Sequence, residues 1–371
     1  MLKLSEMTLA GLCTRSSEKY GKRIAFETYR ENKIYRPVSY RLLGIRSRQC
    51  AALLVSLGIK AGDRVMILAE NSPLWVLAYF GAAIAGAVSV PVPTDLSAEQ
   101  IRGAARHAGV SAIFVSGRFN AKTAGLDPAI PKILLDTFEG DKIQAAVHGI
   151  TKVLPLRDPG GVCDFPRRAA DDPVSIIYSG ETLENGGGLM LSNRNLIRRA
   201  AASRSLIKIF PRDRLLSVIP LAYAHECALG LLAPVMSGSL VACLDRAPSP
   251  QILLSAAQAL RPTIMISDSF FIEKLCGEKI IPPLRKNPLY RLVLTRPFAE
   301  NRAGRKLLKQ LGSSVRFFAV ADQALSAETE AFLRRVKFPL ACCHAAAGGA
   351  ADTRPLYSAT TDPETALPTG A

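Results

Sequence analysis

Segments with a helical spacing of apolar residues alternate with short apolar runs along most of this chain. Residues 40–57 have helical spacing and end at a glycine, and residues 63–69 are typical of a buried strand. Residues 98–108 form the next expected helix, with Ser97 as its N-cap and Glu99 in its first turn. Such alternation is typical of a parallel sheet covered by helices, so we predict an α/β fold.

A less regular stretch, residues 119–172, is rich in proline, glycine and aspartate and is expected to be a peripheral connector. The alternation then resumes, so we predict two helix-covered parallel-sheet lobes, residues 1–165 and 170–345, followed by a loose tail, residues 346–371. The expected strands of the second lobe are 174–178, 215–219, 239–243, 263–266, 292–294 and 315–320, and its helices are 192–206, 226–236 and 326–336.

Residues 75–92 carry no charge and are about as long as a membrane span. The stretch is rich in alanine and glycine and closes on Pro91 and Pro93. A buried helix followed by a buried strand explains it better than a span does. The N-terminus lacks the long apolar core of a signal peptide, so we expect a cytoplasmic protein.

The chain is basic, with 47 Lys and Arg against 31 Asp and Glu, a formal net charge of +16. This excess fits a generally basic protein, or one that lies peripherally on an anionic inner membrane surface. Nucleic acid is an unlikely partner because no aromatic residues interleave the arginine clusters. Eight cysteines without a CxxC pair and four dispersed histidines indicate free thiols and no metal site.

The sharpest local pattern is IIYSGETLENGGGLMLSNRNL, residues 176–196. It predicts a buried strand, a glycine-rich loop and a capped helix, and such a turn can aim backbone N–H groups at phosphate. The same pattern also fits a flexible connector, and the chain has neither the Walker sequence GxxxxGK[ST] nor a GxSxG elbow. The pattern alone leaves both interpretations open.

The segment resembles, without a gap, the phosphate-loop motif YTSGTTGxPKGVMLTHRNL of the adenylate-forming, AMP-binding family, closest to the long-chain fatty-acyl-CoA synthetases. The resemblance implies the N-terminal domain of that family, without its β subdomain and C-terminal lid domain. Other segments match in family order, namely 17–29, 57–65, 71–75, 85–91, 171–172, 220–226, 261–263, 273–274 and 324–328.

The resemblance also shows where this chain departs from the family's phosphate loop. Gly187 stands at the family's lysine, and Glu181 and Glu184 stand at glycines. Carboxylates here would repel phosphates, at a cost of about 1–4 kcal/mol each at surface-like dielectric. The residues that remain compatible with a nucleotide-binding remnant are Ser179, Thr182 and Gly188.

Three further motifs follow. In residues 220–226, which resemble PLHHTYE, Glu226 is kept and Tyr223 stands where the family often has histidine. In residues 321–325, which resemble the adenine-facing GGAAL, Ala324 is kept but the glycines are lost. In residues 344–348, which resemble YGxTE, Gly348 replaces the glutamate that positions Mg²⁺ in the family.

The family's active members are acid–thiol ligases that use ATP and Mg²⁺. Because the chemistry-bearing positions are degenerate, we assign no catalytic residue, metal or cofactor here, and we expect a pseudoenzyme that keeps acyl-chain or adenine-nucleotide binding. Two alternatives stay open: an acyl-adenylating ligase completed by a partner chain, and a decaying, truncated gene product. The apolar segments 75–92, 219–236 and 263–272 could line an acyl tunnel or simply pack shut as core.

Overall fold

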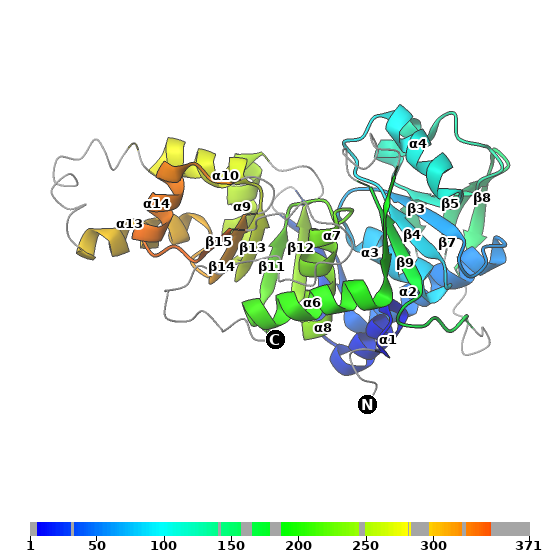
Figure 1. Cartoon of the computed structure of the whole chain (residues 1–371), viewed down its shortest axis with the longest axis horizontal. Coiled ribbons are helices and arrows are strands. Elements are labelled where there is room, and N and C mark those ends of the chain that lie inside the picture. The colour runs from blue at the N-terminus through cyan, green and yellow to red at the C-terminus, as the bar shows by residue number, and fades with distance from the viewer. Residues whose placement is uncertain are drawn as a thin grey trace.

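The computed structural model describes residues 6–30, 33–139, 142–156, 165–178, 187–244, 249–280, 282, 297–320 and 324–342. Two sheets with helices between them and on their outer faces form the described part (Figure 1). The first sheet has the order β10-β9-β4-β3-β5-β6-β7-β8. Its strands are β3 (Arg64–Leu68), β4 (Val88–Pro91), β5 (Val110–Val115), β6 (Lys132–Glu139), β7 (Lys142–Val147), β8 (Ile150–Pro155), β9 (Pro173–Ile177) and β10 (Leu189–Ser192).

The second sheet has the order β15-β14-β13-β11-β12-β1-β2, and its strands are parallel except for β2. Parallel strands need long crossover connections, which the helices provide. The predicted α/β fold is therefore confirmed. The strands are β1 (Ile24–Arg30), β2 (Lys33–Ser39), β11 (Arg214–Ser217), β12 (Leu240–Leu244), β13 (Ile264–Ser267), β14 (Phe317–Val320) and β15 (Leu340–Cys342).

The helices fall into three layers, which follow from the three apolar clusters of the core. Between the sheets lie α1 (Leu9–Tyr20), α2 (Tyr40–Ser56), α3 (Pro73–Ile84), α6 (Asn193–Ile207) and the continuous run α7 (Ala224–Glu226), η3 (Cys227–Leu232) and α8 (Ala233–Ser237), of which η3 is π-helical. Outside the first sheet lie α4 (Ala98–Ala108) and η2 (Gly117–Thr123). Outside the second lie α9 (Pro250–Leu260), α10 (Ser269–Lys274), η4 (Leu275–Ile280), α13 (Pro297–Gln310) and α14 (Ala327–Arg335).

Successive side chains of a strand point to opposite faces of the sheet. Because helices cover both faces of these sheets, alternate side chains enter two different apolar cores. In β3, Val65 and Ile67 face the central helices, whereas Met66 and Leu68 face α4. Strand β3 is therefore apolar on both faces, which explains why its sequence is a continuous apolar run.

Helix α3 is buried around its whole circumference, because every side chain from Trp75 to Ile84 is at most 7% exposed. Strand β4 follows it and is also buried. The predicted buried helix and buried strand of residues 75–92 are confirmed. In the described ranges, no helix is long and apolar enough to cross a membrane.

The predicted helix starts also agree with the structure. Ser97 forms a capping box with Gln100 at the start of α4, and Glu99 lies in the first turn. Ser192 caps α6, and Ser326 caps α14 by accepting from the backbone N–H of Thr329. These caps satisfy backbone donors that have no partner within the helix.

One prediction of secondary structure is wrong. The sequence predicts a less regular peripheral connector for residues 119–172, but they include β6, β7 and β8, which extend the first sheet as an antiparallel edge. Residues 150–153 and 155 are exposed in β8, so this strand lacks the apolar alternation that identifies a strand from sequence.

The sheets also do not divide at residues 165–170, where the sequence places the lobe boundary. The hairpin β1–β2 joins the second sheet by pairing with β12, and β9 and β10 join the first sheet by pairing with β4. The domain limits themselves stay a prediction. The expected strand 292–294 and tail 346–371 lie outside the described residues.

Candidate functional site at the strand ends

The motif positions named from sequence follow the carboxyl ends of parallel strands. Gly187 and Gly188 come after β9, Tyr223 and Glu226 after β11, and Ala324 after β14. Ligands of open α/β sheets bind at this edge, because the loops that follow the strands meet there. Ser179, Thr182 and Gly348 lie outside the described residues.

The described end of the glycine-rich loop is closely packed. A Cβ atom on Gly188 would lie 2.9 Å from both Ile176 Cγ2 and Tyr178 Cε1. A side chain at residue 188 would therefore push β10 away from β9. Gly187, one residue earlier, is partly buried and presents no side-chain charge.

Tyr178, the last described residue before the loop, is fully buried and contacts the outer helix α4. Its hydroxyl lies 2.7 Å from Nδ1 of His107, and the two rings meet edge to face. Burial raises the pKa of Tyr178 above its usual value, so the phenol is neutral and hydrogen-bonds to the imidazole. No local sequence pattern indicates this pair, because the two residues are 71 positions apart in the chain.

The motif at residues 220–226 forms a turn that leads into α7. The rings of Tyr223 and His225 stack, with centroids 6.0 Å apart and planes inclined by 14°. Burial, and to a lesser extent the nearby Asp95 carboxylate, raises the pKa of Tyr223. Asp95 follows β4, so a charge carried by a loop of the first sheet acts on Tyr223 in a loop of the second.

Glu226 is fully buried at the start of the π-helical segment η3. A Cβ atom on Gly230 would collide with its carboxylate. The glycine therefore provides the space that the Glu226 side chain occupies. π-helical turns inside α-helices are often found at functional sites.

Asn71, in the loop after β3, fixes this turn to the first sheet. Its Oδ1 accepts a hydrogen bond from the backbone N–H of Leu221 at 2.8 Å, and its Nδ2 donates to the carbonyl of Ile219 at 2.6 Å. These bonds position the turn that carries Tyr223 and Glu226.

Ala324 lies between β14 and α14, and Glu273 of α10 contacts the residues that follow it. Glu273 accepts hydrogen bonds from the backbone N–H and hydroxyl of Ser326, at 2.6 and 3.1 Å, and from the Thr329 hydroxyl. Burial would raise the pKa of Glu273, but these hydrogen bonds outweigh it and hold the pKa below its usual value. The carboxylate thus fixes the start of α14, two residues after Ala324.

The side chains at the described motif positions supply no positive charge to a polyphosphate. Gly187, Gly188, Tyr223, Glu226 and Ala324 present one carboxylate and no cationic side chain. Bound phosphates need positive charge or several convergent N–H donors. Within the described ranges, no group of three or more His, Cys, Asp or Glu side chains is placed to hold a metal ion.

Most of the apolar positions expected around an acyl tunnel are packed into the core in the described structure, whereas Phe270 is 64% exposed. Residues 75–84 of α3, Leu229–Val235 and the core positions Ile264, Ile266 and Ile272 are at most 7% exposed. Gly81 of α3 lies so close to α2 that an added Cβ would be 2.5 Å from Cys50 Cβ. This arrangement supports the packed interpretation of α3.

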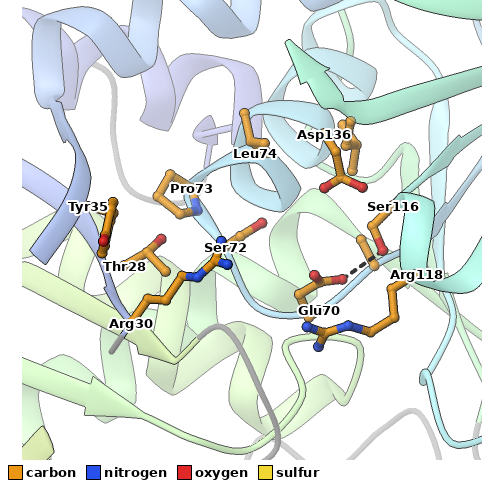
Figure 2. Close-up of a pocket in the computed structure, with 12 residues that line it drawn as sticks. Thr28, Arg30, Tyr35, Glu70, Ser72, Pro73, Leu74, Ser116, Arg118 and Asp136 are labelled. Carbon is orange, nitrogen blue, oxygen red and sulfur yellow. Dashed lines mark hydrogen bonds between the residues drawn. The ribbon is translucent and has the colours of Figure 1, made fainter. Parts of the chain in front are cut away.

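A cavity of about 520 Å³ opens at the same edge of the sheets, and its described lining includes none of these motif positions (Figure 2). Its described wall comes from β1, β2, the loop between β3 and α3, the start of α3, the segment after β5 with η2, and β6. The sequence did not indicate it, because its residues come from elements that are far apart in the chain. The lining residues are Thr28, Arg30, Tyr35, Ala69, Glu70, Ser72, Pro73, Leu74, Ser116, Arg118, Leu135 and Asp136.

Comparisons with known proteins identify relatives of this chain among fatty acyl-CoA ligases. Fatty acyl-CoA synthetase A of Dictyostelium discoideum is 26% identical over 244 residues, which are 62% of this chain and 36% of that protein. A long-chain-fatty-acid–CoA ligase of Mycobacterium tuberculosis is 28% identical over 196 residues, 52% of this chain and 36% of that protein. The matched stretch thus spans little more than a third of either relative.

Solved structures show the same fold. A fatty acyl-adenylate ligase from L. pneumophila, in complex with acyl adenylate and pyrophosphate, superposes with a TM-score of 0.69 at 15% identity, over 91% of this chain and 54% of that one. An anthranilate CoA ligase in complex with anthranoyl-AMP gives 0.68 at 16% identity, over 92% and 60%. The model of the family described as AMP-binding enzyme matches residues 13–369, so this chain belongs to the AMP-binding enzyme family.

Proposed function

We propose that this chain is a catalytically inactive member of the AMP-binding family that uses the inherited fold to bind an adenine nucleotide or an acyl chain. The observation that carries the proposal is Gly187, which stands where the family's phosphate loop has its lysine. A lysine there supplies point charge to the phosphates, and glycine supplies none. Losing one such electrostatic contact typically costs about 10²–10³ in rate.

Substitutions at other family motif positions further weaken the electrostatic stabilisation of phosphate. Glu181 and Glu184 bring negative charge to the same loop, and Gly348 takes the position of the metal-binding glutamate. Like charges beside phosphate are repulsive. We therefore expect AMP, which has one phosphate, or an acyl-AMP mimic to bind more tightly than ATP.

Activity is tested by ATP–pyrophosphate exchange with fatty acids of graded chain length, using a heat-denatured sample as the blank and an active acyl-CoA ligase as the positive control. We expect exchange at the level of the blank. Exchange clearly above it would refute the proposal and favour an acyl-adenylating ligase, alone or completed by a partner chain.

Binding is tested by isothermal titration with ATP, AMP and an acyl-AMP mimic, together with competition of a fluorescent fatty acid by palmitate. Saturable binding of any of these by the folded protein supports a retained binding role. A cooperative unfolding transition would show that the protein is folded. If the folded protein bound none of these ligands, the proposed binding role would be wrong.

Two substitutions at Gly187 test whether the missing positive charge limits ATP binding. Gly187→Lys should tighten ATP binding by about tenfold or more, which corresponds to about 1.4 kcal/mol. Gly187→Ala is the matched control, because it adds a side chain without charge and should leave the affinity for ATP unchanged. Equal affinities of the two variants for ATP would show that the missing charge is not what limits binding.

A further inference from the structure

Cations gather at the amino ends of the parallel strands of the second sheet, the edge opposite to the motif positions. The connections that lead into these strands are residues 21–23, 208–213, 238–239, 261–263, 311–316 and 336–339. Together they hold one carboxylate, the buried Asp213, and seven Lys or Arg residues, all of which are exposed. We call these seven residues the basic edge: Lys22, Arg23, Lys208, Arg212, Arg261, Arg316 and Lys337.

Two arginines of the basic edge join the connections into one surface. Arg23 donates hydrogen bonds to the backbone carbonyls of Gly238, at 3.0 Å, and of Pro211. Arg316 donates to the carbonyl of Lys208 at 2.9 Å. These two side chains are already occupied by the protein, so their role is structural.

The other five cations of the basic edge have no such partner. Asp213, the carboxylate of these connections, is paired with Arg316 at 2.6 Å. Within the described residues, no hydrogen bond or ion pair is formed by the side chains of Lys22, Lys208, Arg212, Arg261 and Lys337. Their positive charges therefore face solvent without compensation from the protein.

Three of these five residues also have a backbone conformation that favours glycine. The φ angle is 54° at Lys208, 48° at Arg261 and 53° at Lys337, and each of them follows the end of a helix. A residue with a Cβ atom is strained there, and glycine is the usual choice. A cation at a helix end also interacts favourably with the helix dipole, so the variants below must separate this structural role from a role in binding.

Exposed apolar side chains lie among these cations. Phe210 is 44% exposed, and the guanidinium carbons of Arg212 and Arg316 lie 5.5 and 5.8 Å from the centre of its ring. Ile24, at the start of β1, is 36% exposed. Clustered cations with exposed apolar side chains are typical of surfaces that lie on anionic membranes. Nucleic acid fits less well, because the two guanidinium groups compete with a nucleobase for stacking on Phe210.

We propose that the basic edge is the surface by which this chain lies on a bilayer that contains anionic lipids. The five cations without partners contact the lipid phosphates, and Phe210 and Ile24 enter the headgroup region. The motif positions follow the opposite ends of the strands, so this proposal does not depend on the proposed nucleotide binding.

The full chain is tested by co-sedimentation with large vesicles of phosphatidylcholine alone or mixed with phosphatidylglycerol. We expect at least tenfold tighter binding to the mixed vesicles at low salt, because each cation near an anionic surface contributes about fivefold in affinity. Added NaCl should weaken this binding, since salt screens exposed charges. A short DNA duplex, titrated in the same buffer, measures binding to nucleic acid.

Two double variants with equal loss of charge locate the surface. Lys208→Gln with Lys337→Gln should weaken binding to the mixed vesicles about twentyfold. Lys142→Gln with Lys152→Gln is the matched control and should change it less than about twofold, because both lysines are exposed on the β7–β8 hairpin of the first sheet. Each variant is first shown to be folded by its thermal unfolding.

Glycine variants separate binding from stability. Lys208→Gly with Lys337→Gly should weaken vesicle binding as much as the glutamine pair does. It should nevertheless melt at a higher temperature than the glutamine pair, because glycine relieves the strain of the positive φ angles. This combination would show that the two charges serve binding rather than the fold.

A fluorophore at the basic edge reports insertion. Phe210→Trp places a second tryptophan there, while Trp75 is only 1% exposed and should not respond. We expect the emission of this variant to shift to the blue with the mixed vesicles and to remain unchanged with phosphatidylcholine alone.

Three outcomes would overturn the proposal. If the folded wild-type protein did not bind the mixed vesicles at low salt, the basic edge would not be a membrane surface. Equal losses in the two glutamine pairs would mean that net charge, and not this edge, drives binding. Tighter binding of the DNA duplex than of the mixed vesicles would assign the basic edge to nucleic acid.

Discussion

Asn71 and Leu221 are 150 residues apart in the chain, and the side chain of Asn71 accepts the backbone N–H of Leu221 at 2.8 Å. The same side chain donates to the carbonyl of Ile219 at 2.6 Å. One side-chain amide therefore forms hydrogen bonds with two backbone groups of the turn after β11. These bonds connect the two sheets at the C-terminal ends of their parallel strands.

Removing this amide should destabilise the protein. Asn71→Ala leaves a partly buried N–H and C=O without their partner, so we expect the free energy of unfolding to fall by about 1–3 kcal/mol. Asn71→Asp keeps the acceptor for Leu221 and should lose less. Urea unfolding measures both, and a loss below about 0.5 kcal/mol for the alanine variant would contradict the bridging role.

A second prediction concerns Asp213, whose side chain is 2% exposed at the start of β11. It accepts hydrogen bonds from Arg316 at 2.6 and 3.0 Å, from the Thr263 hydroxyl at 2.8 Å and from the backbone N–H of Phe210 at 2.7 Å. Asp213→Asn removes the charge that pairs with Arg316. Since Arg316 is partly exposed, we expect a loss near the lower end for broken buried pairs, about 3 kcal/mol.

The pH dependence of that loss has a definite sign. Burial would raise the pKa of Asp213, but hydrogen bonds from Arg316, Phe210 and Thr263 outweigh it and hold the pKa below its usual value. The stabilisation is therefore complete above the unfolded-state pKa of about 3.9 and is lost as the pH falls through the folded-state pKa. The difference in unfolding free energy between wild type and Asp213→Asn should shrink below pH ~4, and a constant difference would contradict this assignment.

A third prediction compares two helical glycines. An alanine Cβ at Gly81 of α3 would lie 2.5 Å from Cys50 Cβ, so Gly81→Ala should cost about 1–3 kcal/mol through overpacking. Gly103 of α4 is exposed and has no atom within 4 Å of its ideal Cβ position, so Gly103→Ala should stabilise by about 1 kcal/mol. Thermal unfolding of both variants checks the opposite signs, and equal shifts would show that α2 and α3 are not closely packed.

A fourth prediction concerns Mg²⁺. Because Gly348 stands at the family's metal-binding glutamate, Mg²⁺ should tighten ATP binding by less than about tenfold, which is 1.4 kcal/mol. Titration of ATP with and without Mg²⁺ measures the ratio. A larger effect would place the metal-binding carboxylate elsewhere, with Asp352 as the first residue to test.

The sequence by itself determined the local elements. Ser97, Ser192 and Ser326 cap the helices they were expected to begin, and residues 75–92 form the expected buried helix and strand. Spacing of apolar residues and capping are properties of a few neighbouring residues, so they can be read from the chain. The motif resemblance likewise identified the family.

Only the tertiary structure decided which strands pair and which distant side chains meet. The hairpin β1–β2 lies beside β12, more than 200 residues later, and β8 joins the first sheet although its side chains are mostly exposed. The Asn71 bridge and the cavity between Arg30 and Glu70 arise in the same way. Backbone hydrogen bonds between strands are the same for almost any sequence, so the choice of partner depends on packing of the whole chain and leaves little trace in local sequence.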